Sequence, residues 1–408
     1  MKPLGPIPPY FTAIDGELAI SGRKASELVE EAGDTPLFVY SAEIIRAKVA
    51  SLRDAFPSRL HLHYAVKANP YQPILELMRS LVDGFDIASM GELAKIADAA
   101  IDPQRVSFAG PGKRDNELEV AIGAGVTLNL ESENEARRAL AISDRLGVRP
   151  RLAIRVNPSF EIRGSGMKMG GGAKPFGVDA ERVPALAKEI IAAGAEWRGL
   201  HIFAGSQSLD AAALIETQGL TLDLAAQLAN EIGTPLPALN LGGGFGIPYF
   251  PGDKPLDIAP IGEALALRMQ SLGSALQDTE FAMELGRYLV GEAGVYLTRI
   301  VDRKLSHGRT FLVTDGGLHH QLAASGNFGT VVRRNYPVAI ASRFDAEPEE
   351  EADVVGCLCT PLDRLADQAH LPRADVRDLV AVFCAGAYGL TASPERFLGH
   401  PPAREILV

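Results

Sequence analysis

Short apolar runs alternate with longer helical stretches along much of the chain. Between about residues 35 and 290, each run ends in a glycine, asparagine, serine or charged residue and is followed by an Ala-, Leu- and Glu-rich stretch. Eight such runs occur, at residues 60–67, 84–89, 105–110, 127–131, 151–157, 199–206, 238–245 and 281–287. Strands alternating with helices indicate parallel βαβ units, and eight units favour a closed (β/α)8 barrel of the TIM type over an open doubly wound sheet.

The pattern changes after about residue 290. Strand-like runs at 294–300, 310–314 and 379–383 follow one another with few long helices, which is typical of a β domain. Residues 11–20 resemble a hairpin that precedes the barrel and can add strands to the β domain. The sequence therefore predicts an α/β protein with a (β/α)8 barrel over residues 35–290 and a β domain built from residues 1–34 and 291–408.

A glycine-rich segment, residues 159–177, follows the fifth run. In a barrel, such a loop lies at the carboxyl ends of the strands, where the chemistry collects, so it is a candidate lid over an active site. A disordered surface insertion is the alternative.

Bulk properties narrow the class of protein. A chain of 408 residues with 47% hydrophobic and 22% charged residues is an ordinary soluble protein, and no segment approaches the roughly 18 apolar residues of a membrane span. The first residues lack the apolar core of a signal peptide, so a cytoplasmic location is expected. A net charge of -11 disfavours broad nucleic-acid or membrane binding, and three cysteines indicate reduced thiols.

Lys67 is the first candidate for chemistry. It ends the apolar run His63-Tyr64-Ala65-Val66, just before a turn, where desolvation would lower its pKa and let the neutral amine attack a carbonyl. The alternative is an ordinary strand-end lysine that extends into water.

Two further groups fall at the same end of the predicted barrel. The glycines of residues 242–246 allow backbone N–H groups to surround an anion, although tight turns also need glycine. Glu284 and Arg287 follow the eighth run, where they either pair with each other or bind a protonated ring nitrogen and a phosphate. An amine, a phosphate cradle and a carboxylate together meet the needs of pyridoxal phosphate.

With these residues in place, the chain resembles the pyridoxal-phosphate decarboxylases of the alanine-racemase barrel type, the group that contains diaminopimelate, ornithine and arginine decarboxylases. The resemblance covers nearly the whole chain. It is carried by the segments at 64–69, 84–89, 205–207, 242–246 and 284–287, by 356–359 with Asp363, and by 386–389.

The resemblance implies a role for each matching position. Lys67 would form the imine with the cofactor, with Asp86 and Glu92 as a supporting acidic pair, and Glu284 would bind the pyridine nitrogen. The phosphate would be held by Gly243, Gly244, Gly246 and Arg287 with Ser206 nearby, and Tyr388 would contact the cofactor from the β domain. Cys359 resembles the family cysteine that enters the active site from a second subunit and protonates the product carbon, which implies a homodimer with shared sites.

The chain departs from the family mainly where substrate is recognised. Phe203 replaces the histidine that stacks on the cofactor ring, and His201 is predicted to point away from the site in a structural role. Thr360 replaces the acidic residue that binds a distal amine, and the Arg-Pro and tyrosine motif of diaminopimelate enzymes is missing around His319. Thr360, His319 and Arg163 are the candidate substrate contacts.

These departures predict an amino-acid substrate that lacks the distal charged groups or is tethered to a carrier protein. Free diaminopimelate is the alternative substrate, and racemisation is an alternative reaction, although Glu284 favours decarboxylation over it. A non-catalytic relative that only binds cofactor is a further alternative, although Lys67 and Cys359 are both retained. The His319-His320 and Cys357-x-Cys359 pairs lack the spacing of a zinc site, so no metal is expected.

Overall fold

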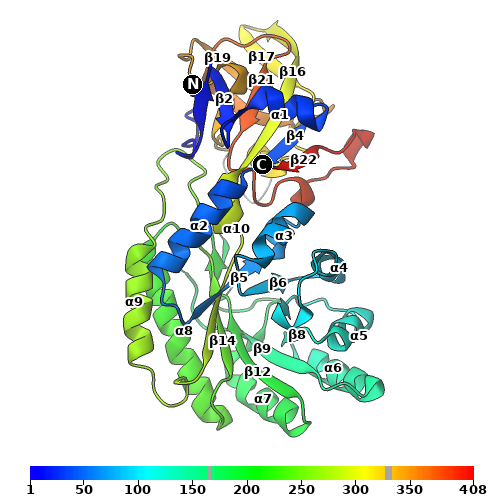
Figure 1. Cartoon of the computed structure of the whole chain (residues 1–408), viewed down its shortest axis with the longest axis vertical. Helices are drawn as coiled ribbons and strands as arrows, with labels where there is room; N and C mark the ends of the chain where they lie inside the picture. The colour runs from blue at the N-terminus through cyan, green and yellow to red at the C-terminus, as the bar shows by residue number, and fades with distance from the viewer. Residues whose placement is uncertain (163–166, 169, 327–332) are drawn as a thin grey trace. The chain divides into compact units, whose positions relative to one another are not determined.

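The computed structural model describes residues 1–162, 167–168, 170–326 and 333–408 (Figure 1). The described chain forms two compact units. The β unit contains Met1–Lys48, Ile247–Pro255 and Arg287–Val408, and the barrel unit contains Val49–Gly246 and Leu256–Gly286. Residues 35–48, 247–255 and 287–290, which were predicted to belong to the barrel, thus group with the β unit. For residues 35–48 the reason is that strand Leu37–Tyr40 pairs with strands of that unit.

Eight parallel strands form the barrel, as predicted. They are β5 (Leu60–Ala65), β6 (Gly84–Ile87), β7 (Val106–Phe108), β8 (Thr127–Leu130), β9 (Arg151–Asn157), β12 (Glu196–Ile202), β14 (Ala238–Gly243) and β15 (Glu280–Leu285). Pairing of β8 with β9 and of β15 with β5 closes the sheet, and this confirms the (β/α)8 architecture. The short strand β11 (Val178–Asp179) adds to β9, and β10 (Met167–Lys168) pairs with β13 (Gly205–Ser206).

Helices precede the first barrel strand and connect the later ones. They are α2 (Ala42–Ala55), α3 (Gln72–Arg79), α4 (Met90–Asp98), α5 (Asp115–Ala124), α6 (Glu133–Leu146), α7 (Val183–Ala192), α8 (Ala211–Ile232) and α9 (Ala259–Gln270). Local sequence sets their ends. Ser89 and Ser132 cap α4 and α6 by accepting backbone N–H groups, whereas Gly125 and Gly147 end α5 and α6 in the left-handed conformation. Amphipathic faces such as that of α3, which buries Ile74, Leu75, Leu77 and Met78, form the core around the barrel.

The β unit is built around the long strand β16 (Gly294–Ser306). Its main sheet has the order β18 (Val338–Ile340), β21 (Leu379–Val382), β16, β17 (Arg309–Thr314), β19 (Glu350–Val355) and β20 (Arg364–Leu371), while β4 (Leu37–Tyr40) joins β16 to β22 (Arg404–Leu407). The predicted hairpin near the N-terminus is confirmed as β1 (Thr12–Ile14) and β2 (Glu17–Ile20), which β3 (Arg23–Lys24) extends. The unit also carries α1 (Ala25–Ala32) and α10 (Arg287–Val290).

Strand register positions the site. In the parallel pairs, His63 lies level with Glu284 and Ala65 lies level with Asp86. The residues that leave the carboxyl ends of β5, β6 and β15 therefore meet at one end of the barrel. Within the described ranges, no helix combines the length and the apolar character needed to cross a membrane.

Candidate active site

Lys67 lies directly after β5, in a short helical turn formed by Val66–Ala68. The Tyr64 hydroxyl donates to the carbonyl of Asn69 at 2.8 Å and fixes this turn. The Lys67 side chain is exposed, so the desolvation expected from the apolar sequence around it is wrong. The buried residues of this run pack below the turn, whereas the amine extends into an open cavity.

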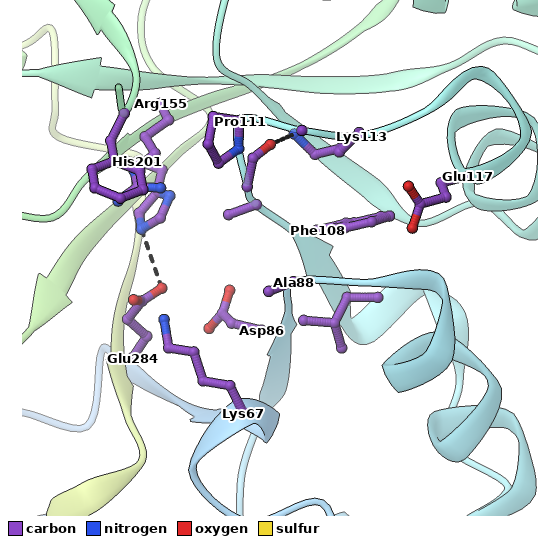
Figure 2. Close-up of a pocket in the computed structure, with 15 residues that line it drawn as sticks. Lys67, Asp86, Ala88, Phe108, Pro111, Lys113, Glu117, Arg155, His201 and Glu284 are labelled. Atoms are coloured by element: carbon purple, nitrogen blue, oxygen red, sulfur yellow. Dashed lines mark hydrogen bonds and ion pairs between the residues drawn. The ribbon is translucent and has the colours of Figure 1, made fainter. Parts of the chain in front are cut away.

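That cavity, of about 350 Å³, is lined by residues from the carboxyl ends of the barrel strands (Figure 2). A volume of this size suits a small organic cofactor. Its polar lining residues are Lys67, Asp86, Lys113, Glu117, Arg155, His201 and Glu284, and its aromatic residues are Phe108 and Phe176. Figure 2 shows the Lys67 amine pointing toward the carboxylates of Asp86 and Glu284.

Glu284 is a buried carboxylate held in its charged form. Its Oε2 lies 3.1 Å from Nε2 of His201 and accepts a long hydrogen bond of 3.4 Å from Asn240. Burial would raise the pKa of Glu284, but His201, Lys67 and Arg155 outweigh it and lower the pKa to about 2. An ionised carboxylate at this position can hold a proton on an aromatic nitrogen.

His201 does not point away from the site, and that prediction is wrong. It lines the cavity beside Lys67 and contacts Glu284. Residues two apart in a strand share a face. Strand alternation therefore places His201 on the same face as position 203, and the prediction of opposite faces misapplied it. The Phe203 ring also lies in this region, with its centroid 5.7 Å from the Lys67 amine.

The acidic pair predicted near Lys67 occupies two different positions. Asp86 lines the cavity, and its Oδ1 accepts a 2.6 Å hydrogen bond from the Ser107 hydroxyl. Glu92 instead accepts the backbone N–H of Ala88 at 2.6 Å. Burial raises the pKa of Glu92, and Lys67 partly opposes that shift.

The backbone of the glycine cluster passes very close to neighbouring backbone segments at the end of β14. A Cβ on Gly243 would lie 1.9 Å from the carbonyl oxygen of Glu284, and Gly244 has φ +87°. The N–H of Gly246 donates to the carbonyl of Ser208 at 2.8 Å, so this group shapes the loop. Ser206, in β13, is half-buried one residue after Gly205, whose carbonyl approaches Gly244. These close backbone approaches make the cluster specific to glycine.

Gly243→Ala is expected to lower the free energy of unfolding by about 1–3 kcal/mol and to weaken cofactor binding, because neither backbone can yield to the added methyl group. The matched control is Gly219→Ala in the middle of α8, where nothing lies within 4 Å of an added Cβ. That change is expected to be neutral or to stabilise by up to about 1 kcal/mol. Denaturant unfolding of both variants is the measurement, and equal stability of the two would contradict the expectation.

Arg287 and Tyr388 meet within the β unit. The Arg287 guanidinium lies 4.5 Å from the centroid of the Tyr388 ring and donates to the Tyr249 hydroxyl at 2.8 Å. Burial opposes the charge of Arg287, but Tyr249 and Tyr388 raise its pKa, and its Nε has no hydrogen-bond partner in the described structure. A buried guanidinium with an unpartnered N–H fits a ligand anion such as phosphate.

The predicted substrate contacts of the β unit lie on two loops joined by Asp363. Its Oδ1 accepts the N–H of Leu318 at 2.6 Å, and its Oδ2 accepts the N–H of Leu358 at 2.8 Å. A Cβ on Gly317 or on Gly356 would lie within 2.2 Å of this carboxylate. The loop that carries His319 and the loop that carries Cys359 and Thr360 are therefore held by one side chain.

The side chains on these two loops differ in exposure. Cys359 is exposed and Thr360 is half-buried, whereas His319 is fully buried with both ring nitrogens unpartnered. Burial, with a contribution from His320 and His400, lowers the pKa of His319 to about 3. His319 is thus neutral at physiological pH.

Arg163, the third candidate substrate contact, lies outside the described residues, as does part of the predicted lid. The described end of that loop is anchored to the barrel. Gly177 donates its N–H to Glu131 at 2.9 Å, and Asn157 donates to the carbonyl of Gly172 at 3.0 Å.

Sequence reasoning missed Arg155, which lines the cavity and pairs with Glu131 at 2.9 Å. An arginine within the apolar run Leu152-Ala153-Ile154-Arg155-Val156 was the available signal, because a charge inside a buried strand is costly unless paired. The three cysteines are free thiols, and the described residues contain no group of three His, Cys, Asp or Glu side chains placed to hold a metal.

The site residues fit a pyridoxal group, because an amine, an ionised carboxylate and a glycine cradle that side chains would fill converge on the barrel end. Comparison with known proteins agrees. Residues 42–291 match the family described as pyridoxal-dependent decarboxylase, pyridoxal binding domain.

Individual relatives align over most of the chain. An L-glutamyl-(BtrI acyl-carrier protein) decarboxylase of Niallia circulans is 36% identical over 92% of this chain and 89% of its own. A diaminopimelate decarboxylase of Archaeoglobus fulgidus is 33% identical over 98% and 93%. The solved structure of AQ1208 from Aquifex aeolicus superimposes with a TM-score of 0.84 at 31% identity, covering 98% of this chain and 92% of that chain. The chain therefore belongs to the pyridoxal-dependent decarboxylases, carboxy-lyases that act with pyridoxal phosphate.

Proposed function

We propose that this decarboxylase acts on an amino acid whose distal end carries no charge, delivered as an ester or amide of a carrier protein. The observation that carries the proposal is the lack of charge at Thr360 and His319, the two candidate substrate contacts that lie within the described residues. Thr360 is neutral by nature, and His319 is neutral because burial and neighbouring histidines lower its pKa to about 3. A free distal carboxylate or ammonium would find no counter-charge from either residue, which costs a desolvated charge a few kcal/mol.

A relative supports the same substrate class. The Niallia circulans enzyme is named for a glutamyl group on an acyl-carrier protein, and it aligns over 92% of this chain. Attachment to a carrier removes the charge of one carboxylate, which matches the neutral loops. Free diaminopimelate, named for the Archaeoglobus fulgidus relative, is the second candidate.

The cofactor residues have separate tasks in this proposal. Pyridoxal phosphate, when bound, supplies an aldehyde that condenses with amino groups and a ring that accepts the electron pair released with CO2. Lys67 would hold the aldehyde carbon, and Glu284 would hold a proton on the ring nitrogen. Phe203 would offer its ring for stacking, and Asp86 would orient the amine of Lys67.

Each unit offers groups for an anionic ligand in this proposal. In the barrel unit, Gly243 and Gly244, with Ser206, would provide a phosphate cradle, and Gly246, whose N–H is bonded to Ser208, would shape its turn. In the β unit, Arg287 would provide a positive charge. Tyr388, which packs on Arg287, orders that guanidinium and contacts the cofactor.

A homodimer completes the site in the same proposal. The Cys359 thiol is exposed in the single chain, as expected for a group that serves a neighbouring subunit, and it donates the proton that replaces CO2 on the substrate carbon. The test of shared sites is to mix two inactive variants that lack different catalytic residues and to measure whether activity returns.

A CO2-release assay over matched pairs of free and carrier-linked amino acids tests the substrate. We expect kcat/KM for a carrier-linked aminoacyl group to exceed that for the same free amino acid by at least about 100-fold, since a buried uncompensated charge costs about 3 kcal/mol. Ordinary turnover of free diaminopimelate, equal to or above that of carrier-linked substrates, would refute the proposal in favour of the second candidate.

A further inference from the structure

Because the Lys67 side chain is exposed, the charges of neighbouring groups decide whether its amine is protonated. Burial does not favour the neutral amine, because the side chain is open to the cavity. The nearby carboxylates of Asp86 and Glu284 favour the charged ammonium (Figure 2). Only the neutral amine has the lone pair that condenses with an aldehyde, so a positive charge near either carboxylate would assist the reaction.

His63 contacts Asp86 from the neighbouring strand. It lies on β5, four residues before Lys67, and its Nδ1 is 3.2 Å from Oδ2 of Asp86. The other oxygen of Asp86 accepts the Ser107 hydroxyl, so the carboxylate is held on both sides. A Cβ on Gly84 would lie 2.4 Å from Nε2 of His63, which shows that β6 leaves space for the imidazole ring.

The groups around His63 favour its protonated form. Burial opposes the charge, but Asp86 on β6, Glu284 on β15 and Asp83 just before β6 together raise the pKa of His63. A cationic imidazole would form a charge-assisted bond to Asp86.

His63 also reaches a second cavity, of about 200 Å³, at the amino-terminal end of the barrel strands. Its side chain is 19% exposed, and the charged or titratable residues that line the same cavity are His61, Asp83, Arg105, Arg198 and Glu280. Asp86 lines the cavity of Lys67 at the other end. The His63–Asp86 pair therefore connects the two cavities, and the imidazole can exchange its proton with solvent without crossing the active site.

We propose that His63 is a positioning residue that holds Asp86 in place and supplies its counter-charge, so that Lys67 gives up its proton more readily. The proton of Lys67 passes to the buffer, and the freed amine condenses with an aldehyde with loss of water. This inference rests on the role proposed above for Lys67. It assigns a function to a histidine that neither the predicted site nor the substrate loops include.

The test measures how fast the cofactor-free protein binds pyridoxal phosphate as a function of pH, from the absorbance of the lysine-bound cofactor. In His63→Gln, which keeps a hydrogen-bond donor but not the charge, we expect the midpoint of the pH profile to rise by about half to one unit. Binding near neutral pH should then be about three- to tenfold slower. The matched control is His61→Gln, an exposed histidine of the same strand and cavity without a contact to Asp86, and its profile should not change.

A double variant separates charge from a merely structural effect. In an Asp86→Asn background no carboxylate is left at position 86 for His63 to hold or to neutralise, so adding His63→Gln should move the midpoint no further. Thermal unfolding monitors folding, and His63→Asn replaces His63→Gln if the latter does not fold. An unchanged midpoint in His63→Gln or His63→Asn, with cofactor binding still lost in Lys67→Ala, refutes the role of His63 alone. Normal binding in Lys67→Ala instead refutes the proposed function.

Discussion

Lys67→Ala is expected to lower the rate of CO2 release by about 10³-fold or more and to abolish the absorption band of lysine-bound cofactor. Lys113, which also lines the cavity, cannot replace it. Its amine is buried and donates to the carbonyls of Gly110 and Asn129 and to Glu135, at 2.6–2.9 Å. The control is Lys95→Ala, an exposed lysine on α4, which should keep both the band and the activity.

Mixing experiments extend this prediction to the proposed dimer. Lys67→Ala and Cys359→Ala chains should each be inactive alone. If two sites are shared between subunits, random exchange should restore about a quarter of wild-type activity, because half of the dimers then contain one intact site. No recovery after confirmed exchange would mean that Cys359 serves its own chain, whereas an active Cys359→Ala enzyme would mean that the thiol has no catalytic role.

Glu284→Gln is expected to reduce kcat by about 10²- to 10³-fold while cofactor binding persists. The amide is similar in size but cannot hold a positive proton on the ring nitrogen as a carboxylate does. Glu280→Gln, an exposed position at the other end of the same strand, is the matched control. A Glu284→Gln enzyme with near-normal kcat would show that another group stabilises the ring charge.

The same variant has a pH signature that does not depend on activity. Because the folded pKa of Glu284 is lowered to about 2, its ionised form stabilises the fold above the ordinary carboxyl pKa of 4.5, and this stabilisation is lost as the pH falls toward 2. The stability difference between wild type and Glu284→Gln should therefore be largest near neutral pH and shrink in acid. Denaturant unfolding across that range measures it.

The fold could be predicted because each strand and helix is indicated by the residues within its own segment of the sequence. Each barrel strand was visible as an apolar run followed by a helical stretch, and closure followed from the number of repeats. Lys67, Asp86 and Glu284 were also within reach, since parallel strands bring their carboxyl ends together. Limits between the units were harder to place, because β4 is an apolar run like the others and only its partners, β16 and β22, set it apart.

Side-chain pairs inside the barrel could not be read from one sequence. His63 meets Asp86 and Arg155 meets Glu131 across neighbouring strands, and these contacts depend on register and on a missing side chain at Gly84. The exposure of Lys67 could not be predicted either, because apolar residues that are adjacent in sequence need not cover the lysine side chain. His201 shows a different failure, because strand periodicity, applied correctly, places it on the same face as residue 203, although its contact with Glu284 is seen only in the structure.

The single carboxylate of Asp363 means that neither of its two loops can change shape independently of the other. Since it joins the loop of His319 to the loop of Cys359, a substitution that reshapes one loop to admit a new substrate also displaces the thiol on the other. New specificities in this scaffold should therefore arise by exchanging side chains on a constant backbone, and loop insertions at these two places should be disfavoured.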